Sequence, residues 1–167
     1  NAVSNCRSVM SYLLENKVAS KIGVSGISLG GFVSSLVVSV DSRVDSAVLL
    51  APVYNVPESY MEWFPLRGLF NKILKEEEVE FQEFRQAYAL CNPLTFQPKV
   101  DTKNLTILTG IFDLIALPKH IRLLGEHWGQ CDIHWLDYSH VGMTKLNPFY
   151  EHIKNHNEKV GFLSELQ

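Results

Sequence analysis

The sequence predicts an α/β fold in which a mostly parallel β-sheet is flanked by helices. Short runs of apolar and β-branched residues alternate with longer stretches that carry apolar residues at helical spacing, and this alternation is typical of a parallel sheet covered by helices. The 167 residues are enough for one domain with a sizeable core. The 46% hydrophobic and 20% charged residues are typical of a globular protein, neither disordered nor membrane-embedded.

The first elements alternate between helix and strand. Residues 3–16 carry apolar side chains at helical spacing, and residues 21–26 form a short apolar run that predicts a strand. Residues 30–40 have the pattern of a helix with one apolar face. A second strand is predicted over 44–50, and Ala51-Pro52 ends it.

The last elements repeat the same alternation. Strands are predicted over 104–110 and 132–136, and helices over 118–128 and 148–159. Strands joined through a helix on one side of a sheet form right-handed crossovers, so we expect these strands to be parallel neighbours.

Residues 55–96 interrupt the alternation, because no convincing strand pattern is found there. Aromatic residues recur at helical spacing instead, and an acidic cluster at 76–78 has the character of a solvated helix face. We expect a helical insertion over one end of the sheet. Two interpretations remain open: amphipathic helices that complete the core, or a cap that covers the substrate.

The pentapeptide Gly26-Ile27-Ser28-Leu29-Gly30 is the motif that carries chemistry. A G-x-S-x-G run between a strand and a helix places the serine on a tight turn, with its hydroxyl exposed above the sheet. Side chains at positions 26 and 30 would collide with the neighbouring strand and helix, so we expect glycine to be required at both. The Leu29 amide, at the start of the helix, is free to donate to an oxyanion. The alternative is a glycine-rich turn with an incidental serine.

A serine nucleophile needs a base, and the base needs an orienting acid. Asp113 lies just past the strand at 104–110, and His140 lies just past the strand at 132–136. Because ligands bind at the carboxyl ends of the strands in open α/β sheets, we expect both side chains to meet Ser28 at that edge. The sequence therefore predicts a Ser-Asp-His triad.

With these residues, the chain resembles the α/β-hydrolase superfamily over essentially its whole length. GISLGG resembles the nucleophile elbow of that family, GIFDLIALP its acid loop and YSHVGM its histidine loop. The resemblance implies an esterase-like or lipase-like serine hydrolase without cofactor or metal. In it Ser28 is the nucleophile, His140 the general base and then acid, and Asp113 the orienting carboxylate. The insertion falls where many members carry a helical cap.

The N-terminal end departs from this resemblance. Family members have further strands before the elbow, and a loop after an early strand supplies the second oxyanion-hole amide. Nothing in residues 1–20 fits that role. We therefore expect 1–167 to be the C-terminal part of a single α/β-hydrolase domain that lacks the N-terminal strands, with 55–96 as its cap insertion. The strand at 21–26 would be an exposed apolar edge, completed by the missing part or by a second chain.

Other residues offer weaker candidates. Asp137 is the alternative acid, although a carboxylate so close to His140 in sequence is better suited to capping the loop. His152 and His156 have a zinc-compatible spacing, but the glutamate of an HExxH site is absent, so no metal site is expected. Cys131 is expected to be a buried structural thiol. Three distant cysteines favour free thiols and hence the cytoplasm, although the compartment stays unknown.

The composition of the chain argues against some classes of binding partner. The formal charge is −3 and basic residues are scattered, which argues against nucleic acid, and no apolar run is long enough to cross a bilayer. The leading hypothesis is hydrolysis of a small-molecule ester or other acyl substrate through an acyl-enzyme, and the aromatic residues of the insertion favour an apolar or lipid-like acyl group. The alternatives are a prolyl-oligopeptidase-like peptidase, a thioesterase, and a non-catalytic binding or scaffold protein that retains the fold.

Overall fold

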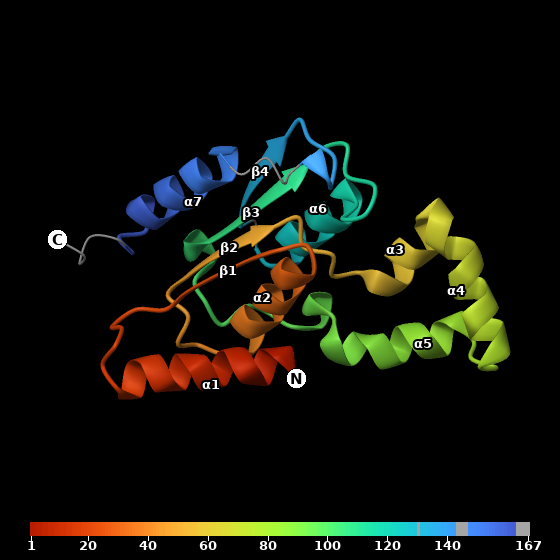
Figure 1. Cartoon of the computed structure of the whole chain (residues 1–167), viewed down its shortest axis with the longest axis horizontal. Coiled ribbons are helices and arrows are strands. Elements are labelled where there is room, and N and C mark those ends of the chain that lie inside the picture. Colours follow the sequence, from red (N-terminus) through yellow and green to blue (C-terminus); the bar gives the residue numbers. More distant parts are fainter. Residues whose placement is uncertain (130, 143–146, 163–167) are drawn as a thin grey trace.

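Figure 1 shows the computed structural model of the chain, which describes residues 1–129, 131–142 and 147–162. Strands, α-helices and short 3-10 helices alternate along the chain. Their order is α1 (Ala2–Glu15), β1 (Gly23–Ile27), α2 (Leu29–Val40), β2 (Ser46–Leu50), α3 (Val56–Glu62), α4 (Phe64–Glu76), α5 (Phe81–Tyr88), η1 (Ala89–Cys91), η2 (Pro93–Thr95), η3 (Thr102–Asn104), β3 (Leu105–Gly110), α6 (Pro118–His127), β4 (Asp132–Leu136) and α7 (Asn147–Lys159).

The four strands form one parallel sheet in the order β1-β2-β3-β4. The register aligns the carboxyl ends of neighbouring strands: Ile27 lies opposite Leu50, and Gly110 lies opposite Leu136. The predicted parallel sheet is therefore confirmed, with each predicted strand found within two residues of its expected bounds. All four strands end at the same edge, where the elbow and the loops after β3 and β4 begin.

The central strands carry the core. Every residue of β2 and of β3 is buried, because helices cover both faces of the sheet. On one face, Leu49 and Ile107 pack with residues of α2 and α6, such as Val37 and Leu124. Figure 1 shows α7 over the opposite face, where Ile153 of that helix packs against the cluster around Val48, Leu50 and Leu108.

Strand β1 lies at the edge of the sheet and differs from its neighbours. Its residues alternate between exposed and half-buried positions, and Ile27 at its end is 43% exposed. The expectation of an exposed edge strand is thus confirmed for the described residues.

Residues 55–96 form a helical segment that lies to one side of the sheet (Figure 1). An aromatic cluster joins its three α-helices to one another and to α2. Phe70 of α4 is the centre of this cluster, at ring distances of 5.3 Å from Tyr60 and 5.2 Å from Phe84. Tyr88 stacks on Phe32 of α2 at 6.3 Å and so connects the segment to the sheet core. None of the eight residues of α5 is buried.

Helix α1 is fastened to the end of α2 by a buried carboxylate. Asp41 accepts hydrogen bonds from Arg43 Nη2 at 2.6 Å and from Arg7 Nε at 2.9 Å. These bonds, that of Arg43 first, hold the pKa of Asp41 well below its ordinary value, although burial opposes the shift. Among the described residues, no helix combines the length and the apolar character needed to span a bilayer.

Candidate active site

Ser28 occupies the sharp turn between β1 and α2. Its backbone has φ of 55° and ψ of −113°, a conformation that a residue with a Cβ adopts only at a cost of about 1–3 kcal/mol. The turn is held because the Ser28 amide donates to the Leu50 carbonyl at the end of β2, while the Ser28 carbonyl accepts from the Phe32 amide. Ser28 is therefore in strained backbone between the strand and the helix.

The glycines around the elbow differ in what they permit. A Cβ on Gly26 would overlap the carbonyl group of Gly30, so the expectation that glycine is required at position 26 is confirmed. The same expectation for Gly30 is wrong, because a Cβ there meets no atom within 4 Å. The second close approach occurs at Gly31 instead. A Cβ on that residue would lie 2.9 Å from the Leu50 carbonyl oxygen and 3.1 Å from the Pro52 Cα.

Asp113 is placed and oriented by the loop that follows β3. The residue is 1% exposed. Its Oδ1 accepts from the backbone amides of Ile115 and Ala116, each at 2.8 Å, which leaves Oδ2 for His140. Sequence reasoning missed these two amides, although an aspartate that binds the amides two and three residues later is a common turn signal. The carboxylate is thereby fixed before it contacts the histidine.

His140 lies between the other two side chains. Its Nδ1 is 2.8 Å from Asp113 Oδ2, and its Nε2 is 2.9 Å from Ser28 Oγ. A carboxylate only accepts, so Nδ1 donates to Asp113, and neutral Nε2 is left to accept the Ser28 hydroxyl proton. The structure therefore brings all three predicted residues together in the arrangement that can activate a serine for attack.

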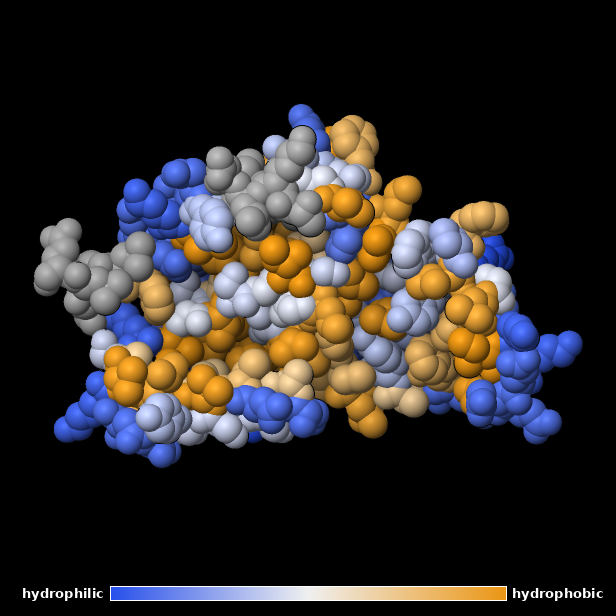
Figure 2. Space-filling view, in the orientation of Figure 1, coloured by the Kyte–Doolittle hydropathy of each residue, from blue (hydrophilic) through white to orange (hydrophobic). Residues whose placement is uncertain are grey.

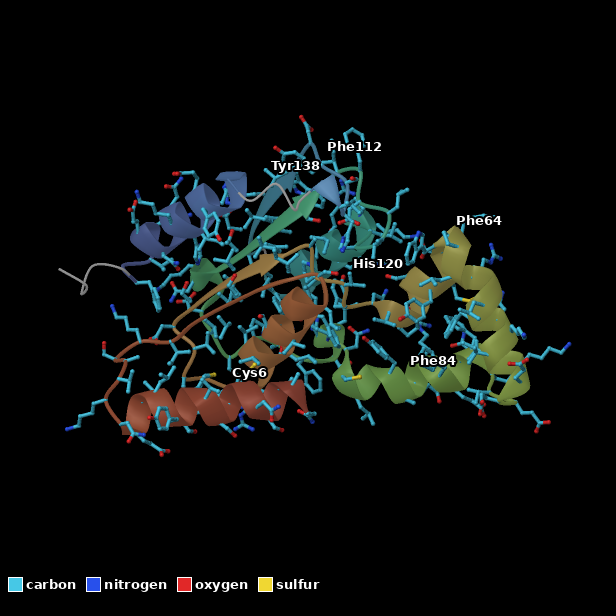
Figure 3. All side chains as sticks on the ribbon, in the orientation of Figure 1. Cys6, Phe64, Phe84, Phe112, His120 and Tyr138 are labelled. Carbon is cyan, nitrogen blue, oxygen red and sulfur yellow. The ribbon has the colours of Figure 1, made fainter. Side chains whose placement is uncertain are left out.

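The loops after β3 and β4 are tied to each other. The Ile111 amide donates to the Leu136 carbonyl, and the Phe112 amide donates to the Tyr138 carbonyl at 3.2 Å. Figure 3 shows Phe112 and Tyr138 close together at the top of the view. A Cβ on Gly110 would overlap the Tyr138 carbonyl, so this glycine lets the two loops approach. The separation between Asp113 and His140 is set by these backbone contacts.

The alternative site residues are not brought to the triad. Asp137 is exposed, and Asp113 holds the Nδ1 atom of His140 that a rival acid would need. His156 donates from Nε2 to the Asn104 carbonyl at 3.1 Å, while the ring of His152 lies 4.9 Å from that of His134. In the described ranges, no group of three or more histidine, cysteine or acidic side chains is arranged to hold a metal ion.

Two further buried groups lie away from the triad. Burial raises the pKa of Cys131 to about 11, as expected for an inert structural thiol. His120 of α6 is 5% exposed and lies between the sheet core and the helical segment (Figure 3). Its Nδ1 is 3.4 Å from Ser59 Oγ, its Nε2 is 3.6 Å from Glu62 Oε1, and burial lowers its pKa. The sequence did not indicate this contact between α3 and α6.

The chain is similar to an uncharacterized protein of Mycobacterium tuberculosis, with 29% identity over 163 residues. The match covers 97% of this chain, which spans 38% of the length of that relative. No protein-family model matches the chain.

Several solved structures share its fold. Est1E from Butyrivibrio proteoclasticus superposes with a TM-score of 0.69 at 13% identity, covering 95% of this chain and 69% of Est1E. A Pyrococcus furiosus esterase superposes with a TM-score of 0.68 at 16% identity, covering 94% of this chain and 61% of the esterase. A Pyrococcus horikoshii acylaminoacyl peptidase superposes with a TM-score of 0.64 at 14% identity, covering 93% of this chain and 26% of the peptidase. With the parallel sheet, these similarities show that the fold is that of the α/β-hydrolases.

Proposed function

We propose that the protein is a serine hydrolase that cleaves a carboxylic ester through an acyl-enzyme. The observation that carries the proposal is the continuous hydrogen-bonded chain from Ser28 through His140 to Asp113, at 2.9 and 2.8 Å. Similarity of fold to an esterase and to an acylaminoacyl peptidase supports the same reaction class.

In the proposed reaction, His140 takes the Ser28 proton while Oγ attacks the ester carbonyl carbon. The Oγ–C bond forms as the carbonyl π bond breaks, and the electron pair moves to the carbonyl oxygen. The carbonyl π bond then re-forms as the C–O bond to the alcohol breaks, and His140 gives its proton to the leaving oxygen. Water, which gives a proton to His140, attacks the acyl-enzyme in the same way; the C–Oγ bond breaks, Ser28 takes the proton back and the acid is released. The buried carboxylate of Asp113 stabilises the imidazolium at each stage. No cofactor or metal enters these steps.

We assign the Leu29 amide as one donor to the oxyanion. It is the first residue of α2, and the first amides of a helix have no partner within the helix. The helix dipole places partial positive charge at the same point. The oxyanion needs a second hydrogen-bond donor. We expect this donor to come from a loop after an early strand of the fold, which residues 1–20 do not supply.

We further propose that residues 55–96 act as a cap on this site. The segment lies beside the sheet and is joined to α2 through the Phe32–Tyr88 stack. Phe32 follows Ser28 by about one turn of α2, so the segment is attached to the helix that begins at the serine.

We propose that β1, the edge strand of the sheet, contacts a further part of a longer protein that includes this chain. The relative from Mycobacterium tuberculosis is more than twice as long as the matched region, and β1 is half exposed. The 167-residue chain should therefore associate in size-exclusion chromatography or melt without cooperativity. A monomer with a cooperative melt would count against this contact.

Labelling with a fluorophosphonate probe tests the enzymatic proposal. We expect the full-length protein to react and the Ser28→Ala variant not to react. The matched control is Ser25→Ala, which removes an exposed serine three residues away and should keep labelling. His140→Gln should slow labelling by several orders of magnitude.

Two outcomes would favour the other candidates. Absence of labelling with the triad intact favours a binding or scaffold protein that retains the fold. Labelling with faster turnover of aminoacyl amides than of esters favours a peptidase, a candidate supported by the fold similarity to an acylaminoacyl peptidase. Faster turnover of thioesters would favour a thioesterase.

A further inference from the structure

The three loops that carry the triad also carry exposed apolar side chains. These side chains immediately flank Ser28 and His140 and surround Asp113 in the sequence, and each is at least 40% exposed. We call this set the apolar rim: Ile27, Leu29, Ile111, Phe112, Leu114 and Val141. Large exposed apolar groups are unremarkable singly, but a group gathered at one site marks a binding surface.

The position of the rim follows from the backbone around the triad. Ile27 ends β1 and Leu29 begins α2, so both are adjacent to the nucleophile. The backbone bonds between residues 111–112 and 136–138 hold the acid loop against the histidine loop. Figure 2 shows hydrophobic residues gathered over this end of the sheet. The residues of the apolar rim are therefore neighbours of the triad residues along the chain, and their loops meet at one edge of the sheet.

The triad loops carry few charged side chains. Residues 26–31, 110–116 and 137–142 contain two acidic side chains, Asp113 and the exposed Asp137, and no lysine or arginine. The Asp113 carboxylate is buried, and its oxygens are taken by two amides and His140. The exposed Asp137 carboxylate would repel a negatively charged substrate. In the described parts of these loops, no lysine or arginine is present to pair with a phosphate or carboxylate of a substrate, a common way in which proteins bind such groups.

We propose that the apolar rim binds the uncharged acyl chain of an ester substrate, so that the protein prefers medium-length or long aliphatic acyl groups. The inference rests on the proposed function. Contact with a growing chain removes apolar surface of both partners from water. Each added methylene should therefore raise kcat/KM by about fourfold until the rim is covered, the factor that corresponds to about 0.8 kcal/mol.

A series of p-nitrophenyl esters tests the proposal on the full-length protein. We expect kcat/KM to rise from acetate through butyrate to octanoate, and the negatively charged hemisuccinate to react more slowly than butyrate. The Leu114→Ser variant should lower the octanoate-to-acetate ratio about tenfold. Leu123→Ser is the matched control, because Leu123 is a 48% exposed leucine on α6 outside the triad loops, and the ratio should not change.

The outcomes separate this inference from the function on which it rests. Fluorophosphonate labelling of Ser28 with no dependence on chain length, or with a preference for hemisuccinate, overturns the inference and leaves the hydrolase intact. Absence of labelling overturns both. The inference also fails if the rim is a protein interface, which would show as an oligomer that Phe112→Ser dissociates while the chain-length profile stays flat.

Discussion

The sheet core and the helical segment at 55–96 are stabilised in different ways. In the core, β2 and β3 are buried on every residue and backbone pairing sets their register. In the helical segment, α4 buries one residue, Phe70, and α5 buries none. The segment contacts the core through the Phe32–Tyr88 stack and through the approach of His120 to Ser59 and Glu62. An ion pair of Lys119 with Glu62 and the packing of Leu94 against the core add to these contacts.

This difference explains why the triad is built on one region and the proposed cap on the other. Atoms that must stay within hydrogen-bond distance need rigid supports, and the ends of buried parallel strands provide them. A segment that covers a site must open, and low local stability means that opening requires little free energy. We therefore expect the two regions to respond differently to the same kind of change.

The largest expected effect is on the core. Leu108→Ala removes a side chain that is fully buried in β3, and we expect the free energy of unfolding to fall by about 2–5 kcal/mol, because a cavity remains. Urea denaturation of the full-length protein, followed by circular dichroism, measures it. Leu69→Ala, at a 55% exposed position in α4, is the control and should cost less than about 0.5 kcal/mol. Equal losses in the two variants would contradict the contrast.

An acid titration should loosen the contact between α1 and the end of α2, which the Asp41 carboxylate holds. The pKa of Asp41 is below its ordinary value of about 4, so its stabilisation is complete above that pH and is lost progressively as the pH falls below it. Asp41→Asn should lower the free energy of unfolding at pH 7 by about 1.5–3 kcal/mol. The free energy of unfolding of this variant should also fall less steeply below pH 4 than that of the unchanged protein. Glu76→Gln is the control, because the exposed Lys72–Glu76 pair contributes little. If the free energy of unfolding of Asp41→Asn falls with acid as steeply as that of the unchanged protein, the Asp41 carboxylate is not the group that stabilises this contact.

The elbow tests whether the core tolerates added volume beside the nucleophile. Gly26→Ala forces a Cβ against the Gly30 carbonyl, and we expect a loss of about 1–3 kcal/mol together with a displaced Ser28. Gly30→Ala is the matched variant. Its Cβ enters open space in the first turn of α2, so stability should be unchanged or rise by up to about 1 kcal/mol. Thermal melts of the two variants give the comparison, and similar losses in both would contradict it.

The same two glycines show how far the sequence could predict this site. The strand ends, Ser28, Asp113 and His140 were predictable, because hydrophobic periodicity locates parallel strands and their loops share one edge. The requirement for Gly31 was not predictable, because it depends on where the backbone passes from Leu50 to Pro52, a contact between separate segments. For the same reason, the helical character of 55–96 could be predicted, but the packing of Tyr88 on Phe32 could not.

The smallest expected effect concerns that stack, which joins the two regions. In a double-mutant cycle of Phe32→Leu and Tyr88→Leu, we expect a coupling energy of about 0.5–1.5 kcal/mol, because an aromatic pair contributes beyond the area it buries. Hydrogen exchange should show faster opening of α3 to α5 in either variant, while β2 and β3 keep their protection. Phe64→Leu, at an 89% exposed ring, is the control and should change neither quantity. If exchange rises equally in β3, the helical segment and the core open as one unit, and the segment cannot act as a cap that moves independently of the triad.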